Sequence, residues 1–224
     1  MSCTSRVVIV GSGSTMPDSR LRKLVDERDY LIAADGGADA LYRVELLPDV
    51  IIGDMDSISS ELWRRIQNAE DGPRIIRHPE RKDSTDSELA LRYALKLSPP
   101  TRPILMLGVF GDRLDHCLGL LMAVAGLPQA DRRRITLSDG SQFARVFSGE
   151  LEISGSPGDL VSLLPLTPRV GDVHLEGFSF SLAGEDLRWG NTLGVSNRLA
   201  KPRGRISVKG RGVLLAIHTP SQME

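Results

Sequence analysis

The sequence predicts an α/β protein, built on a mostly parallel sheet with flanking helices and followed by a smaller all-β sandwich or barrel domain. Between residues 6 and about 137, short apolar runs alternate with amphipathic helical segments, which is typical of a parallel sheet covered by helices. After about residue 138 the apolar runs continue between Gly, Pro, Asp and Asn without a helical pattern, as in antiparallel β structure. We therefore expect an α/β domain at residues 1–138 and a β domain at residues 139–224, with the boundary at Asp139-Gly140.

The expected strands of the α/β domain are apolar runs between turn residues. They cover residues 6–10, 30–34, 49–53, 74–78, 103–108 and 134–138. Helical spacing of apolar side chains is clearest at residues 84–97 and 113–126. The second of these helices carries an apolar stripe made of Leu114, Leu118, Leu121, Met122 and Ala125. We expect this stripe to face the core with Cys117 on it, Asp115 to point away from the core, and Trp63 to pack from another helix.

The β domain is expected to consist of short strands. They cover residues 143–147, 151–154, 160–166, 172–180, 206–210 and 212–218. The residues between them are rich in Gly, Pro, Asp and Asn, which favour turns. Short strands at this spacing are typical of a sandwich or barrel.

Composition excludes several classes of protein. The chain has 224 residues, of which 41% are hydrophobic and 25% charged, with a formal net charge of -1, as in ordinary globular proteins. It has no basic excess for nucleic-acid binding and no apolar run long enough to span a membrane. The polar start and short first apolar run do not fit a signal peptide, and Cys3 and Cys117 form no CxxC pair. We therefore expect a cytoplasmic protein.

Four short acidic motifs follow expected strands and are the most informative feature of the sequence. They are Asp35-Gly36-Gly37, Asp54-Met55-Asp56-Ser57, Lys82-Asp83-Ser84-Thr85-Asp86 and Gly111-Asp112-Arg113-Leu114-Asp115-His116. In a parallel sheet, all four would lie at the edge where ligands bind. Two carboxylates ~4 Å apart repel by ~4 kcal/mol at an effective dielectric constant of ~20, so this crowding needs cations. A Mg²⁺ site that holds a polyphosphate satisfies that need.

The second and fourth motifs also have structural interpretations. Asp54 and Asp56 are two residues apart, which directs both side chains to one side of an extended segment, although Gly, Asp and Ser are also common in turns. Asp112 is an expected N-cap, which would place Arg113 at the sheet edge, where its guanidinium group can bind phosphate oxygens. His116 is either a hydrogen-bonding support of the site or an ordinary helix residue.

The third motif is expected to open a helix. Thr85 and Glu88 have the spacing of a capping box, and Asp86 would then favour the helix dipole without any ligand. Capping does not explain Asp83 or Lys82 in the preceding loop. A structural role and a ligand-binding role therefore both stay open for this motif.

Two further segments have a candidate role. The loop at residues 11–15, GSGST, resembles a dinucleotide-binding loop only in part, because Met16 replaces the third glycine, but its N–H groups could bind a phosphate. In the β domain, Trp189 is flanked by Arg188 and Gly190, which does not suit a core position. Its indole either stacks on a flat cationic ring or is an ordinary loop aromatic.

Taken together, the motifs resemble those of the thiamine pyrophosphokinase family. The resemblance is carried by ADGGA at 34–38, PDVIIGDMDSI at 48–58, KDSTD at 82–86, GDRLDH at 111–116 and GVSN at 194–197. These segments come in the family's order and spacing, and the resemblance extends over nearly the whole chain. The resemblance implies an α/β domain followed by a β domain, and transfer of the pyrophosphoryl group of ATP to the hydroxyl of thiamine with release of AMP.

The resemblance also implies roles for individual residues. The Mg²⁺ ligands would be Asp54, Asp56 and Asp83, with Asp86, Arg113 and Asp115 as further catalytic residues. ATP would contact Asp35, Gly36, Gly37, Lys82 and His116. Thiamine would contact Asp115, Trp189, Ser196 and Asn197, with the site formed across a homodimer interface. Asp86 and Asp115 are both candidates to accept the hydroxyl proton, and some relatives carry Gln where Lys82 stands.

Two other activities fit an acidic sheet edge. One is a pyrophosphokinase for another heteroaromatic alcohol, such as a hydroxymethylpterin. The other is a Mg²⁺-dependent phosphohydrolase whose β domain is a binding module. The products distinguish them, because hydrolysis gives phosphate or pyrophosphate without a new ester. A pure binding protein is disfavoured, because a clustered acidic edge is costly to keep for binding alone.

Overall fold

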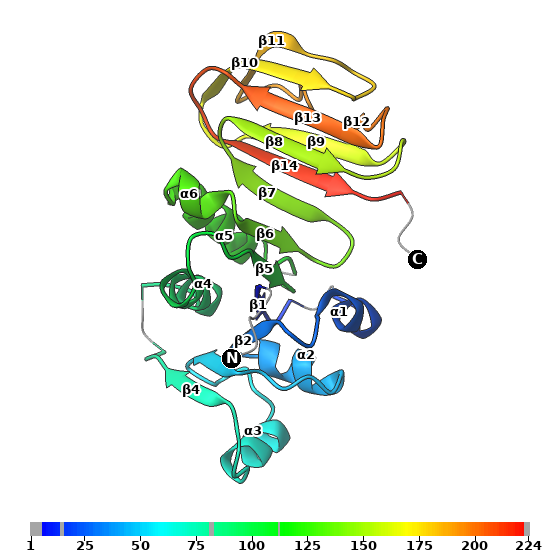
Figure 1. Ribbon diagram of the computed structural model, residues 1–224. Helices are drawn as coiled ribbons and strands as arrows, with labels where there is room; N and C mark the ends of the chain where they lie inside the picture. Colours follow the sequence, from blue (N-terminus) through cyan, green and yellow to red (C-terminus); the bar gives the residue numbers. More distant parts are fainter. Residues whose placement is uncertain (1–5, 14–15, 81–82, 112, 222–224) are drawn as a thin grey trace. The chain divides into compact units, whose positions relative to one another are not determined.

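Figure 1 shows the computed structural model, which describes residues 6–13, 16–80, 83–111 and 113–221. The chain divides into two compact units. The first unit consists of Met1–Ala123 and Arg134–Gly140, and the second of Val124–Arg133 and Ser141–Glu224. Lys82 and Asp112, for which the sequence predicts roles, lie outside the described residues, as do Ser14 and Thr15 of the first loop.

The first unit is built on a parallel sheet whose strands lie in the order β6-β5-β1-β2-β3-β4. The strands are β1 Val7–Val10, β2 Tyr30–Ala34, β3 Val50–Gly53, β4 Arg74–Arg77, β5 Ile104–Leu107 and β6 Ile135–Ser138. All neighbouring pairs among them are parallel. Each strand falls within a run predicted from the sequence. The prediction succeeded because strands of a sheet that is covered on both faces are apolar along most of their length. The acidic motifs follow β2, β3, β4 and β5, so they come after the carboxyl ends of parallel strands.

Helices cover both faces of this sheet (Figure 1). They are α1 Asp18–Leu24, α2 Gly37–Arg43, α3 Ser60–Gln67 and α4 Asp86–Leu97, and α5 Leu114–Gly126 follows β5. Helices α1, α2 and α3 share one apolar core with Val8, Val10 and Ile51, and Trp63 of α3 packs against it as predicted. Helix α4 contacts β1, β2 and β3 and buries Leu91. Since side chains alternate between the faces of a strand, α4 covers the face opposite this core.

The predicted orientation of α5 is wrong. Leu114 is 68% exposed, Met122 is 70% exposed, and Leu118 between them is exposed as well. The buried side of the helix is instead formed by Leu120 and Val124. Apolar residues lie on more than one side of this helix, so spacing alone did not identify which side is buried.

The second unit is a sandwich of two antiparallel sheets. Its strands are β7 Phe143–Phe147, β8 Glu150–Ser154, β9 Leu160–Pro165, β10 Arg169–Glu176, β11 Ala183–Arg188, β12 Asn197–Arg198, β13 Arg203–Val208 and β14 Leu214–Thr219, and α6 Gln129–Arg132 is a short helix of the same unit. One sheet has the order β12-β9-β14-β7 and the other β11-β10-β13-β8. Val161 and Leu163 of the first sheet share a core with Val173 and Ile206 of the second. The predicted α/β fold followed by a β sandwich is therefore confirmed.

Two strands of the second unit were not predicted. β11 has the polar sequence AGEDLR, and β12 comprises only two residues, so neither shows an apolar run. Within the described residues, none of the helices has the length and apolar character that crossing a membrane requires.

Candidate active site

Three carboxylates converge at the carboxyl ends of β2 and β3. Oxygen atoms of Asp35, Asp54 and Asp56 lie within 4.8 Å of one another. Asp35 comes directly after β2, and Asp54 directly after β3. The sequence predicts metal ligands at Asp54 and Asp56, whereas it gives Asp35 a role in nucleotide binding. The conformation of the turns after the strands decides which acids converge, and the spacing of residues in the sequence does not show that conformation.

Backbone geometry brings these carboxylates together. Asp35 has φ of 46° and Met55 has φ of 72°, in the left-handed region that residues other than glycine rarely adopt. A Cβ atom on Gly37 would lie 1.9 Å from the carbonyl oxygen of Val10, so only glycine lets α2 begin this close to β1. Strained backbone of this kind persists where the surrounding structure fixes it, and it is concentrated at functional sites.

Asp35 is the most constrained of the three acids. Asp35 is only 6% exposed, and its Oδ1 atom is buried without a hydrogen-bond partner among the described residues. Burial raises the pKa of Asp35 above its ordinary range, and the negative charges of Asp86, Asp56 and Asp54 raise it further, against a hydrogen bond from Ser57 that lowers it. A bound cation would give this buried carboxylate oxygen a partner, because carboxylate oxygens are the ligands that Mg²⁺ and Ca²⁺ prefer.

Asp86 and Asp83 border a larger pocket beside this cluster. The pocket has a volume of about 520 Å³, and both residues line it together with Asp54, Asp56 and His116. A Cβ atom on Gly53 would lie 3.0 Å from Oδ1 of Asp86 and 2.9 Å from Cβ of Asp35, which shows how closely Asp86 approaches the cluster.

The start of α4 explains how Asp86 is held there. The Thr85 hydroxyl accepts a hydrogen bond from the N–H of Glu88 at 3.3 Å, which confirms Thr85 as the predicted N-cap. The Glu88 carboxylate pairs with Arg92 one turn later, at 2.6 Å. Asp86 therefore begins the helix directly after the cap, with its carboxylate at the sheet edge.

Arg113 and Asp115 form an exposed ion pair at the start of α5. Nε of Arg113 donates to Oδ1 of Asp115 at 2.9 Å, and Nη2 donates to Oδ2 at 2.6 Å. The hydrogen bonds from Arg113 lower the pKa of Asp115 to about 2. Asp115 is exposed as predicted and stays negatively charged near neutral pH.

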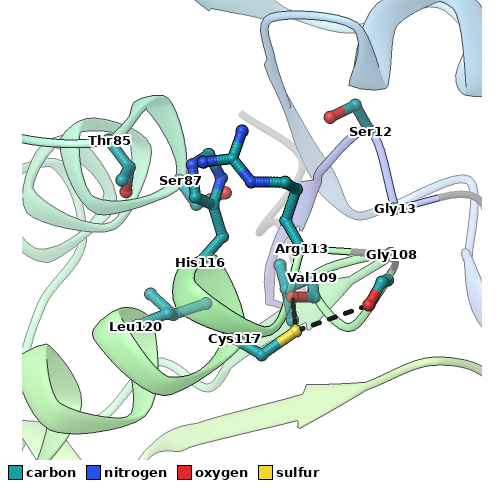
Figure 2. Close-up of a pocket in the computed structure, with 11 residues that line it drawn as sticks. Ser12, Gly13, Thr85, Ser87, Gly108, Val109, Arg113, His116, Cys117 and Leu120 are labelled. Atoms are coloured by element: carbon teal, nitrogen blue, oxygen red, sulfur yellow. Dashed lines mark hydrogen bonds between the residues drawn. The ribbon is translucent and has the colours of Figure 1, made fainter.

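A second pocket, of about 140 Å³, lies between α4, α5 and the loop after β1 (Figure 2). Ser12 and Gly13 line it from the loop, Ser87 from α4 and Thr85 from its N-cap, and Arg113, His116 and Cys117 from the α5 segment. Figure 2 shows the Cys117 thiol among backbone carbonyls, and Sγ lies 3.8 Å from the carbonyl oxygen of Val109. His116 is exposed and lines both this pocket and the larger one.

The first loop offers fewer phosphate donors than its glycines suggest. The N–H of Gly11 donates to Leu107 and that of Gly13 donates to Gly108, both at 2.8 Å. Ser12 and Gly36 line a further pocket of about 300 Å³ next to this loop. Gly36 and Gly37 stand at the start of α2, beside Asp35.

Trp189, Ser196 and Asn197 lie in the second unit and differ in accessibility. Trp189 is 62% exposed, so the prediction that it does not belong to the core is confirmed, and its Nε1 donates to Pro165 at 3.1 Å. Ser196 is exposed, and Asn197 is buried. Ser196 has a left-handed backbone with φ of 59°, and its N–H donates to the Ser162 hydroxyl.

Comparison with known proteins identifies the family. The model of "Thiamin pyrophosphokinase, catalytic domain" matches residues 21–137, more than half of the chain, and that of "Thiamin pyrophosphokinase, vitamin B1 binding domain" matches residues 150–212. The chain belongs to the thiamin pyrophosphokinase family. The family model of the catalytic domain spans Asp35, Asp54, Asp56, Asp86 and Asp115, and that of the vitamin B1 binding domain spans Trp189, Ser196 and Asn197.

Individual thiamin pyrophosphokinases resemble the chain over almost its full length. Thiamine pyrophosphokinase of Bacillus subtilis is 30% identical over 218 residues, which cover 96% of this chain and 98% of the relative. Thiamine pyrophosphokinase 1 of Arabidopsis thaliana is 26% identical, with 98% of this chain and 92% of the relative covered. The crystal structure of the B. subtilis enzyme has a TM-score of 0.85 at 28% identity, covering 97% of this chain and 100% of that one. That of thiamin pyrophosphokinase from Geobacillus thermodenitrificans has a TM-score of 0.81 at 26% identity, covering 96% and 98%.

Proposed function

We propose that the protein is a Mg²⁺-dependent thiamine pyrophosphokinase, which transfers the pyrophosphoryl group of ATP to the hydroxyl of thiamine. The cluster of Asp35, Asp54 and Asp56 supports this function most strongly, because it supplies a divalent-cation site at the ligand-binding edge of a parallel sheet. In the reaction, the thiamine hydroxyl oxygen bonds to the β-phosphorus of ATP. The bond from that phosphorus to the oxygen bridging the α-phosphate breaks, and AMP leaves.

The residues present fit a Mg²⁺ ion. Asp35 has a buried oxygen without a hydrogen-bond partner among the described residues, and Asp54 and Asp56 bring two more carboxylates within 4.8 Å of the Asp35 carboxylate. Asp83 lines the adjacent pocket and is a further candidate ligand. When bound, Mg²⁺ supplies positive charge that neutralises the polyphosphate and draws it toward an edge that would otherwise repel it.

The nucleotide is proposed to lie between the acid cluster and the start of α5. Gly36 and Gly37 bring the backbone of α2 close to the site, and His116 faces the pocket that also holds Asp86. The Arg113 guanidinium would bind phosphate oxygens and stabilise charge that develops during transfer. Lys82, outside the described residues, stays a predicted ATP contact.

Two acids at the site are proposed to have different tasks. Asp115 is held in its charged form by Arg113, with a pKa of about 2, so it is a poor proton acceptor near neutral pH. Its lasting negative charge suits a partner with a positive charge, such as the thiazolium ring of thiamine. Asp86, which borders the cluster of Asp35, Asp54 and Asp56, is then the better candidate to orient the hydroxyl and take its proton.

Thiamine is proposed to contact the second unit. The Trp189 indole is exposed and held by one hydrogen bond at its edge, which leaves ring surface for stacking on a flat cation. Ser196, whose backbone is fixed by Ser162, lies on the loop that precedes β12 and is a candidate for a polar contact.

A homodimer is part of this proposal. Leu114, Leu118 and Met122 lie at i, i+4 and i+8 of α5 and are all exposed, so they form an apolar row on one side of the helix. Exposed apolar rows of this kind mark interaction surfaces. In a two-fold dimer the same row of a second copy can cover it, since both subunits present the same patch.

Incubation with ATP, Mg²⁺ and thiamine tests the function. We expect AMP release that depends on both thiamine and Mg²⁺, and that stops when the metal is chelated. AMP release without thiamine, or turnover of a hydroxymethylpterin in place of thiamine, would contradict the proposal.

A further inference from the structure

The side chain of Asn197 is committed to the backbone of a neighbouring segment. Its Oδ1 accepts hydrogen bonds from the N–H of Phe180 at 3.0 Å and from the N–H of Arg198 at 2.8 Å. Its Nδ2 donates to the carbonyl oxygen of Phe180 at 2.8 Å. A side-chain amide has two acceptor positions and two N–H donors, so both acceptors and one donor are used.

Burial also removes Asn197 from any ligand. The residue is 4% exposed, and it pairs with Val161 of β9 as part of β12. A thiamine molecule at the surface of this unit therefore cannot reach most of its polar atoms. If Asn197 influences thiamine binding, it does so through the residues that it holds.

Phe180 is the residue that this amide holds from both sides. Its N–H and its carbonyl oxygen both bind Asn197, yet its side chain is 72% exposed. The residues before it are tied to the same partner segment, because Ser179 donates to Arg198 at 2.9 Å and Phe178 is buried beside Leu199. The backbone that carries Phe180 is thus held by hydrogen bonds, while most of the residue stays exposed and gains little from burial.

The surroundings of Phe180 point to a small flat ligand. Asn197 directly follows Ser196, the exposed residue proposed to contact thiamine. Trp189 and Asn197 both contact strand β9. Nε1 of Trp189 donates to the carbonyl oxygen of Pro165, and Asn197 pairs with Val161. Four strand positions separate these two attachments, which is roughly 13 Å at about 3.3 Å per residue. Ser196 binds Ser162 of the same strand, so it is attached between the attachment points of the two exposed aromatic residues.

We propose that Phe180 contacts an aromatic ring of thiamine, and that Asn197 is a positioning residue that acts on thiamine binding only by holding Phe180. This inference rests on the proposed function and adds a second aromatic contact to Trp189. An exposed aromatic ring on a held backbone offers a flat apolar surface to a planar ligand, and ordering it restricts only two side-chain torsions. It predicts that the effects of Asn197 and Phe180 are not independent.

A double-mutant cycle tests the inference. Phe180→Ala is expected to raise the thiamine KM about two- to tenfold and to leave the ATP KM and the melting temperature unchanged, since the lost ring is exposed. Asn197→Ala is expected to raise the thiamine KM by a similar factor. The double variant should be no worse than the more affected single variant, because one residue acts through the other. Leu47→Ala, at another highly exposed apolar residue, is the matched control and should change neither KM.

Each other result has a defined meaning. An unchanged thiamine KM for Phe180→Ala overturns the inference, and so does a change in subunit association with the thiamine KM unaltered. Effects of the two single variants that multiply in the double variant show that Asn197 does not act through Phe180, which overturns its positioning role. Failure of the wild-type chain to convert thiamine overturns the proposed function itself, so the two failures are distinguishable. If Asn197→Ala does not fold, Phe180→Ala alone still decides whether the ring contacts thiamine.

Discussion

Asp35 and Asp115 are both carboxylates of the first unit, but their surroundings give them opposite properties. Burial and the charges of Asp86, Asp56 and Asp54 raise the pKa of Asp35, so its ionised form is unfavourable without a cation. Arg113 instead holds Asp115 in the charged form. The sequence shows both acids after apolar runs, but only the folded surroundings separate an acid whose charge is disfavoured by burial from one whose charge Arg113 stabilises.

Replacing Asp54 or Asp56 with Asn should abolish pyrophosphoryl transfer without unfolding the protein. Each change removes one negative charge from the cluster of acids within 4.8 Å, so repulsion in the metal-free protein falls. We expect the melting temperature without ligand to stay level or rise. The stabilisation that Mg²⁺ gives to the wild-type protein should be lost.

Asp71→Asn, at an exposed acid away from the site, serves as the control and should leave both activity and the Mg²⁺ effect intact. Near-normal activity in both Asp54→Asn and Asp56→Asn would remove these residues from the proposed metal site.

Trp189→Ala should raise the thiamine KM far more than the ATP KM. The exposed indole is proposed to stack on a cationic ring, and losing ~1–2 kcal/mol of such contact corresponds to roughly a tenfold or larger change in KM. Steady-state kinetics with each substrate varied in turn measures this difference. Equal effects on both substrates, or an unfolded variant, would assign Trp189 a structural role.

At the scale of elements, apolar runs correctly predicted the strands whose side chains are buried. β1, β3 and β5 are continuous apolar runs and are fully buried. Strand β12 and helix α5 show the limit of this approach. The first is too short for a pattern, and the second has apolar residues on several sides, so packing decided what the sequence left open.

Asp159, between β8 and β9, holds the segment after β14 as far as Ser221 and should make the stability of the protein pH-dependent. Its buried carboxylate accepts hydrogen bonds from the backbone of Ser221 at 2.8 Å and of Ser156 at 2.9 Å, and it pairs with His218 at 2.9 Å. Burial alone would raise the pKa of Asp159, but the hydrogen bonds from Ser221, His218 and Ser156 together hold it well below its ordinary value of 3.8.

The sign of the pH effect follows from this depressed pKa. The ionised carboxylate stabilises the folded protein above the ordinary pKa of 3.8, and that stabilisation is lost as the pH falls below it toward the folded-state value. Asp159→Asn should lower the free energy of unfolding near neutral pH by about 1–3 kcal/mol. It should also flatten the loss of stability below pH ~4, which urea unfolding at several pH values measures. Asp71→Asn, at an exposed acid, is the control, and an equal effect there would contradict the role given to Asp159.

For the whole molecule, the acids and the exposed tryptophan lie in different units of the chain. Asp54 belongs to the first unit and Trp189 to the second. In the proposed homodimer, a site can take its acids from one chain and its aromatic contact from the other. The order of motifs in the sequence indicated two domains, but it did not show that α5 leaves an apolar row exposed.

Co-expression of Asp54→Asn and Trp189→Ala chains should therefore restore activity. A mixed dimer would hold one site with both changes and one with neither. With random pairing about half of the dimers are mixed, so about a quarter of wild-type activity should return when thiamine is kept well below its KM. Leu118→Asp should instead give monomers and low activity, because it places a charge in the apolar row of α5. A monomeric wild-type protein in light scattering, or no recovery despite proven mixed dimers, would show that each chain builds its site alone.

The fate of the γ-phosphate of ATP tests the central claim most directly. Thiamine, Mg²⁺ and ATP labelled at the γ-phosphate are incubated with the protein, and the products are separated. Transfer of the pyrophosphoryl group predicts the label in thiamine diphosphate, with an equal amount of unlabelled AMP and no ADP. Label in free phosphate or pyrophosphate without a thiamine ester, or ADP together with thiamine monophosphate, would contradict the account.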